Sequence, residues 1–353
     1  MNFTEKKTHY NILFIILTVI LFLLIIFCAA LGAADINFFK SMKILFSKLP
    51  FINILIDTSN IKASESLIVL NIRLPRILMS IIIGIGLSIV GCSFQAIFKN
   101  PMADPYILGI SSGSALGATV GIILNFSFLS KFLNSVIGIS FFAFLGGILT
   151  TLFVYNIARV GKKLPTNTLL LSGVTMSFLL SSIISILMLF NRNQLEDIYM
   201  WTMGSVSSAS WQELKIVVPI ILIGSLIIIS LSKDLNIMLT GDSTAESLGV
   251  NVEKVKKIIL ITSSLIVASC VSVTGIIGFV GLIIPHITRL IVGPDHKILF
   301  PFSALFGAIF LTITDTLART LINPSEIPVG VITALFGAPY FLYLLYQNKK
   351  KVL

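Results

Sequence analysis

The sequence predicts an all-α integral membrane protein with about ten transmembrane helices. Of its 353 residues, 56% are hydrophobic and 11% are charged, and the mean hydropathy is +1.02. So few charged side chains leave too little polar surface to cover a water-soluble globule of this size. The apolar runs reach the roughly 20 residues that a helix needs to cross the hydrocarbon core, and they lack the alternation of barrel strands.

Ten apolar runs have the length and composition of membrane-spanning helices. They cover residues 10–32, 69–98, 106–125, 132–158, 168–190, 213–232, 256–275, 278–292, 299–318 and 328–346. We expect one polytopic domain over residues 1–353, with a polar segment at 241–257 between the sixth and seventh spans. Gly275, Gly278, Gly281 and Pro285 predict that the region of the seventh and eighth spans is broken into short helices at membrane depth.

The first run follows two lysines, Lys6 and Lys7. Its apolar core is longer than the 7–15 residues of a signal peptide, which favours a membrane anchor over a cleaved leader. A lipoprotein cysteine at Cys28 is disfavoured because the bulky Phe27 precedes it. We therefore interpret this run as the first transmembrane helix.

The distribution of lysine and arginine predicts the topology. With the N-terminus inside, fifteen of the 25 basic residues fall in inner segments and ten in outer ones. This bias has the sign of the positive-inside rule, so both termini and the segment 241–257 are predicted to be cytoplasmic. The net charge of +10 fits basic helix ends facing anionic lipid and gives no reason to propose nucleic acid as a partner.

Cysteines and histidines do not form a recognisable metal or redox motif. The cysteines at 28, 92 and 270 lie in apolar runs without C-x-x-C spacing, so we expect packing residues and no disulfide or zinc site. His286 and His296 have no accompanying carboxylate or thiolate cluster, which favours a structural helix end over a metal centre. We expect no metal and no cofactor.

Several mechanisms are disfavoured by what the sequence lacks. It has no P-loop pattern, so the chain cannot hydrolyse ATP in the P-loop manner. Ionisable residues are nearly absent from the spans, which counts against a proton- or sodium-coupled carrier. No paired acid, base or nucleophile supports an intramembrane enzyme, and we expect no catalytic residue.

Small residues recur at a spacing of four in the second and third spans. Gly113, Gly117 and Gly121 would lie along one helix face, and Gly84 and Ser88 repeat the spacing. Such faces permit close helix packing, and they can also line a transport pathway. The spacing alone does not distinguish these two interpretations.

The polar segment GDSTAESLGVNVEKVKK, residues 241–257, has the punctuation of two joined helices. Ser243 and Glu246 have capping-box spacing, which predicts a short helix beginning at Thr244. Gly249 can end that helix in a left-handed conformation, and Asn251 can cap the helix that continues into the seventh span. A compact helical projection is expected, with an ordinary cytoplasmic turn as the alternative.

Four stretches together resemble the FecCD family, the permeases of bacterial ABC importers for iron-siderophores, haem and cobalamin. They occur in the expected order and span nearly the whole chain. These stretches are RLPRILMSIIIGIGLSIVGCSFQAIFKNPMADPYILGISSGSALGA (73–118), GDSTAESLGVNV (241–252), GFVGLIIPHITRLIVGPDHK (278–297) and NPSEIPVGVITALFGAPYFLYLL (323–345). Tyr106 stands where the family often has glycine. The resemblance implies a ten-span, BtuC-like permease fold.

The resemblance also implies partners: a second permease subunit (in a homodimer or paralogous heterodimer), two ATPase subunits inside and an extracytoplasmic substrate-binding protein outside. The fifth and tenth spans would meet at the dimer interface. The implied ATPase-coupling residues are Asp242, Ser243, Glu246, Ser247, Leu248, Gly249, Val250 and Asn251. The implied binding-protein docking residues are Arg73, Arg76 and Arg319. The implied gate residues are Asn100, Met102, Thr166 and Asn167.

We therefore expect a non-catalytic permease subunit in the cytoplasmic membrane. Its cargo is expected to be an iron(III)-siderophore complex, with haem or cobalamin as the alternative. A secondary transporter without ATPase partners is the competing class. Substrate selection would rest with the binding protein, because no titratable or metal-ligating groups are expected along the path.

Overall fold

The computed structural model describes residues 3–352 except 33, 35, 49–60, 125–134, 162 and 323–324. Within these ranges the chain is almost entirely helical, with no β-strand and one isolated bridge between Val160 and Lys163. The predicted start of the fourth span at 132 and the motif residues Asn323 and Pro324 lie outside the described residues.

Each predicted span coincides with a helix. These helices are α1 (Phe3–Ala30), α4 (Leu74–Ile97), α5 (Ile110–Ile123), α6 (Ser135–Ala158), α7 (Thr166–Phe190), α9 (Trp211–Ser230), α12 (Val252–Thr274), α13 (Val280–Val292), α14 (His296–Thr320) and α15 (Val329–Val352). By length and hydropathy, seven of the described helices can cross a membrane, and α5, α13 and α15 supply shorter apolar stretches. The chain is a multi-pass membrane protein.

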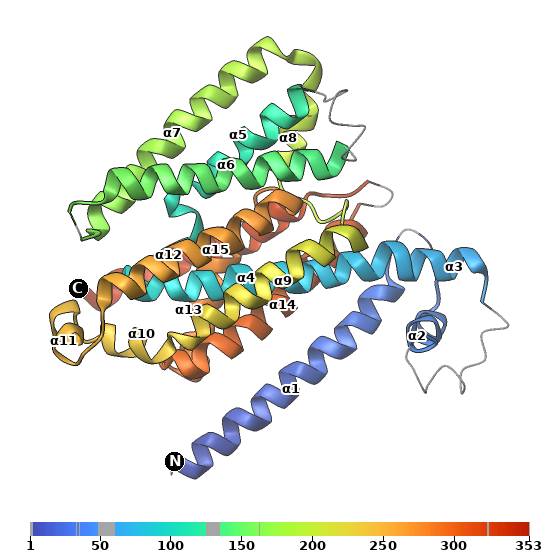
Figure 1. Cartoon of the computed structure of the whole chain (residues 1–353). Coiled ribbons are helices and arrows are strands. Elements are labelled where there is room, and N and C mark those ends of the chain that lie inside the picture. The colour runs from blue at the N-terminus through green and yellow to red at the C-terminus, as the bar shows by residue number, and fades with distance from the viewer. Residues whose placement is uncertain are drawn as a thin grey trace.

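Short helices connect these spans. They are α2 (Phe38–Phe46), α3 (Ala63–Leu67), the π-helix η2 (Ile68–Arg73), the 3-10 helices η3 (Pro105–Leu108) and η4 (Arg192–Gln194), α8 (Leu195–Thr202), α10 (Ser232–Met238) and α11 (Asp242–Ser247). α10, α11 and the N-terminal end of α1 lie at one end of the bundle, and α2 and α3 lie at the other (Figure 1). At the end where α10 and α11 lie, the Tyr10 hydroxyl of α1 donates to the Val292 carbonyl of α13 at 3.0 Å and joins these two helices.

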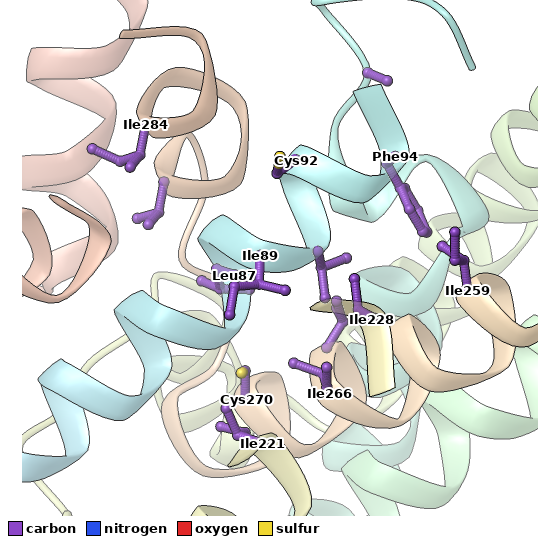
Figure 2. Close-up of a cluster of buried hydrophobic side chains, with 14 of the residues drawn as sticks. Leu87, Ile89, Cys92, Phe94, Ile221, Ile228, Ile259, Ile266, Cys270 and Ile284 are labelled. Atoms are coloured by element: carbon purple, nitrogen blue, oxygen red, sulfur yellow. The ribbon is translucent and has the colours of Figure 1, made fainter. Parts of the chain in front are cut away.

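Helix α4 forms the centre of the bundle and packs against α9, α12, α13 and α14. Figure 2 shows Leu87, Ile89 and Phe94 of α4 among isoleucines of α9 and α12. The cysteines at 28, 92 and 270 are each at most 1% exposed and unpaired, which confirms that they are packing residues.

Glycines set how closely the helices around α4 approach. A Cβ at Gly84 would overlap the backbone of Gly307 on α14, and a Cβ at Gly91 would overlap Gly281 on α13. The same holds between α5 and α6, where a side chain at Gly113 or Gly117 would strike the α6 backbone. The glycine spacing in the third span is therefore a packing feature, as in other membrane helix pairs.

The predicted break between the seventh and eighth spans is confined to residues 275–279. Gly275 has a φ of +67° and Phe279 a φ of +68°, and α13 begins at Val280. Gly281 and Pro285 lie inside α13, so the prediction that they interrupt it was wrong. Pro285 has no N–H to donate to the carbonyl of Gly281, yet α13 continues through it. Gly281 allows α13 to pack closely against α4, because a Cβ there would overlap the backbone of Leu87.

Candidate functional site

The segment after α10 forms the helical projection that its sequence predicts. α11 ends in a Schellman motif, in which the Val250 N–H bonds the Ala245 carbonyl and the Gly249 N–H bonds the Glu246 carbonyl, each at 3.0 Å. Gly249 has a φ of +89°, which confirms the left-handed cap. Leu248 is 65% exposed at the tip. The projection therefore has a defined shape and an exposed apolar contact.

The start of α11 differs from the prediction. The helix begins at Asp242 rather than Thr244, and Ser243 does not cap it; instead the Ser243 carbonyl accepts a bond from the Ser247 hydroxyl. Gly241, with a φ of +125°, supplies the break before the helix. Asn251 does cap α12, because its Oδ1 accepts from the Lys254 N–H at 3.0 Å. The capping-box prediction was wrong, and the Asn251 prediction is confirmed.

Asp242 holds α11 against two other elements. Its Oδ1 lies 2.6 Å from the Lys99 Nζ, just after α4, and its Oδ2 lies 2.6 Å from the Lys256 Nζ on α12. Partial burial raises the pKa of Asp242, but the bonds from Lys256 and Lys99 outweigh it and leave the pKa below its usual value. The carboxylate is therefore charged at neutral pH and links α4, α11 and α12.

The predicted gate residues lie at the same end of the bundle, one pair in the turn after α4 and the other at the start of α7, directly after a second turn. Asn100 directly follows Lys99, and its Oδ1 accepts a hydrogen bond from the Met102 N–H at 2.9 Å. Met102 also lines a small cavity with α13 and α15. Thr166 and Asn167 begin α7. The first pair thus follows the end of α4 and the second pair begins α7, and the role of these four residues as a gate stays a prediction.

Both of these turns are tied to α11 or α12. Lys99 connects the first turn to Asp242. In the second, the Leu164 N–H donates to Glu253 Oε2 of α12 at 3.1 Å. Movement of α11 and the start of α12 would therefore pull on both turns. The roles of Lys99 and Glu253 were missed from sequence because their partners are 143 and 89 residues away. Lys256 was missed because it meets Asp242 only through the angle between α11 and α12.

The three arginines predicted to dock a binding protein are buried, with exposed fractions of 4%, 7% and 6% for Arg73, Arg76 and Arg319. Arg73 donates to the carbonyls of Ala29, Ala30 and Ala34, and Arg319 donates to that of Cys28. These bonds join the end of α1 to α4 and α14. Guanidinium groups suit such multiple acceptors.

Arg76 is paired within the chain. Its guanidinium bonds Asp315 of α14 at 3.0 Å and Glu326 at 2.8 Å. The Asp315 side chain is only 2% exposed, whereas that of Glu326 is 42% exposed. The structure therefore gives all three arginines internal partners, and docking through them stays a prediction.

An open apolar hollow lies between α8, the 275–279 turn and α15. It has a volume of about 600 Å³, and its lining residues include Met203, Ile276, Phe279, Ala334 and Pro339. None of its lining residues is titratable. The Tyr106 hydroxyl donates to the Ile277 carbonyl at 2.9 Å and braces the turn. The hollow offers a largely apolar wall to a large solute and no carboxylate, imidazole or thiolate ligand to a bare metal ion.

Helices α7 and α15, the predicted dimer-interface spans, both expose large apolar side chains. Phe178 and Phe190 of α7 are 73% and 79% exposed, and Leu335 and Leu342 of α15 are each 65% exposed. Such faces suit either lipid or a second subunit. The assignment of the dimer interface stays a prediction.

Comparison with known proteins gives consistent matches along the chain. The sequence profile of the FecCD transport family matches residues 19–347. The cobalamin import system permease protein BtuC of Halobacterium salinarum is 41% identical over 290 residues, which are 82% of this chain and 76% of that protein. The iron(3+)-hydroxamate import system permease protein FhuG of Bacillus subtilis is 33% identical over 97% of this chain and 99% of its own.

A solved structure also has this architecture. An inward-facing metal-chelate type ABC transporter superposes with a TM-score of 0.81 at 32% identity, covering 96% of this chain and 99% of the other.

Proposed function

This chain belongs to the FecCD transport family, and we propose that it carries an iron(III)-siderophore complex across the cytoplasmic membrane. Members of the family are non-catalytic membrane subunits of ABC importers, and separate subunits hydrolyse the ATP. We further propose that two permease subunits form the complex with two ATPases and an extracytoplasmic binding protein. Both termini and the segment 241–257 would face the cytoplasm.

The observation that carries the coupling role is the link between α11 and the two turns at the predicted gate residues. The Lys99–Asp242 pair and the Leu164–Glu253 bond connect those turns to one rigid projection. The exposed Leu248 tip would enter the ATPase, and the residues 242–251 around it would transmit its movement. A disordered loop could not transmit force in this way.

The cargo proposal rests on two supports. The iron-hydroxamate relative aligns over 97% of this chain and 99% of its own, and the hollow beside α15 has no titratable lining residue. Iron would therefore have to enter already chelated. The cobalamin relative is more identical but over less of its own length, so cobalamin, together with haem, is the alternative cargo of the same importer.

Uptake by the reconstituted complex tests this proposal. Proteoliposomes holding the permease, its ATPase and its binding protein would be given radiolabelled ferric hydroxamate, haem or cobalamin, with and without internal ATP. We expect uptake of ferric hydroxamate that depends on ATP. Tenfold excesses of haem or cobalamin should not reduce this uptake. Preferential uptake of haem or cobalamin would overturn the cargo, and uptake without the ATPase would overturn the importer mechanism.

A further inference from the structure

A narrow apolar cavity of about 180 Å³ lies between α6, α9 and α12. Its wall includes Phe144 of α6 and Val217 and Ile220 of α9. Two residues at its rim, Phe141 and Ile216, are 48% and 57% exposed. Because these helices span the membrane and exposed apolar residues flank the opening, the cavity opens sideways into the bilayer.

One carboxylate enters this apolar cavity. Glu213 is only 4% exposed, and its Oε2 completes a capping box with the Ser210 N–H and hydroxyl at 3.1 and 3.2 Å. Its Oε1 is buried and has no hydrogen-bond partner. Among the described residues, no basic side chain forms an ion pair with it. The capping box explains one oxygen and leaves the other in need of a donor.

The polar and apolar parts of the cavity lie at different depths. Ser140, Ser272 and Glu213 are at the ends of their helices farthest from α11, whereas Phe144 and Ile220 lie further into the bundle. Trp211, two residues before Glu213, is 40% exposed and donates its indole N–H to the Leu70 carbonyl. Exposed tryptophans mark the membrane–water interface. Glu213 therefore sits at head-group depth, with the apolar wall below it.

We propose that this cavity binds a membrane lipid with a primary ammonium head group, of the phosphatidylethanolamine class. The ammonium would donate to Glu213 Oε1, and an acyl chain would lie along Val217, Ile220 and Phe144. An anionic head group would be repelled by the carboxylate, and a choline head group has no N–H to donate. Charge-assisted bonds of this kind are the stronger ones in a site shielded from water.

Lipid binding to the delipidated permease in detergent tests this proposal independently of the cargo. Thermal shifts and native mass spectrometry would compare phosphatidylethanolamine, phosphatidylcholine and phosphatidylglycerol at equal concentration. The wild type should prefer phosphatidylethanolamine. Glu213→Gln should bind it on the order of tenfold more weakly, while glutamine preserves the capping-box geometry.

Ser210→Ala is the matched control, because it weakens the helix cap but keeps the carboxylate. It should lower the melting temperature and leave the preference for phosphatidylethanolamine intact. Equal binding of the three lipids by the wild type, or an unchanged preference in Glu213→Gln, would overturn the proposal. Competition by free ethanolamine at the same concentration as the lipid would also overturn it, since the site would then accept a soluble amine.

Discussion

Replacing Gly249 by valine should uncouple ATP hydrolysis from transport while the bundle stays folded. Gly249 has a φ of +89°, and a Cβ added there meets no heavy atom within 4 Å. The substitution therefore causes backbone strain without a clash. For a β-branched residue in this conformation the strain is about 2 kcal/mol, which lowers the population of the observed bend roughly thirtyfold.

The strain acts on the junction between α11 and α12. Its relief would turn the Leu248 tip away from its position and break the Val250–Ala245 bond of the Schellman motif. The packing of the transmembrane helices should be unaffected, because Gly249 is exposed and a Cβ added there comes within 4 Å of none of their atoms. The variant is expected to insert normally but to lose substrate uptake, with the ATPase either dissociating or hydrolysing ATP without response to the loaded binding protein.

Two control variants separate coupling from strain. Gly249→Asn should stay close to the wild type, because asparagine tolerates the left-handed conformation. Gly293→Val introduces similar strain in the turn after α13, where φ is +87° and the added Cβ also meets nothing within 4 Å. Uptake and stimulated ATPase activity would be measured in proteoliposomes. Wild-type values for inserted Gly249→Val, or equal losses in Gly293→Val, would refute the coupling role.

Three further predictions concern topology and ion pairs. A reporter fused after Lys257 should be cytoplasmic and one fused after Lys62 external, as read by alkaline phosphatase and green fluorescent protein fusions; the opposite pattern would reverse the orientation. Asp242→Asn should cost about 1 kcal/mol of stability at pH 7. Because the folded pKa of Asp242 is lowered, this difference should be fully present above the ordinary carboxyl pKa of 3.8 and should be lost as the pH falls further, through the lower folded pKa. A difference in melting temperature that does not shrink below pH 3.8 would contradict the pairing. Arg76→Gln should destabilise the protein by about 3–5 kcal/mol, because Asp315 is left buried without its cation, and a melting temperature within 2 °C of the wild type would show that the pair is dispensable.

The sequence alone determined the features that depend on neighbouring residues. Hydropathy placed each predicted span on a helix, seven of them long and apolar enough to cross a membrane, because the bilayer requires crossing segments to be apolar and helical. The Gly249 cap and the Asn251 cap followed from residues within five positions of each other. These caps depend only on neighbouring residues, so they form in any tertiary structure that contains both helices.

Tertiary structure decided which distant groups meet. Lys99 and Asp242 are 143 residues apart, and Arg76 and Asp315 are 239 apart, so no local pattern pairs them. The predicted cap at Ser243 failed because Gly241 already breaks the chain and the two lysines hold Asp242 at the start of the helix. The arginines predicted to face a partner are buried because acceptors within the chain bind them. These acceptors are carbonyls at the end of α1, Asp315 of α14 and Glu326 in the loop after α14. Charges in a nearly dry bundle bind the acceptors that the fold brings closest, and those acceptors are set by how the helices pack.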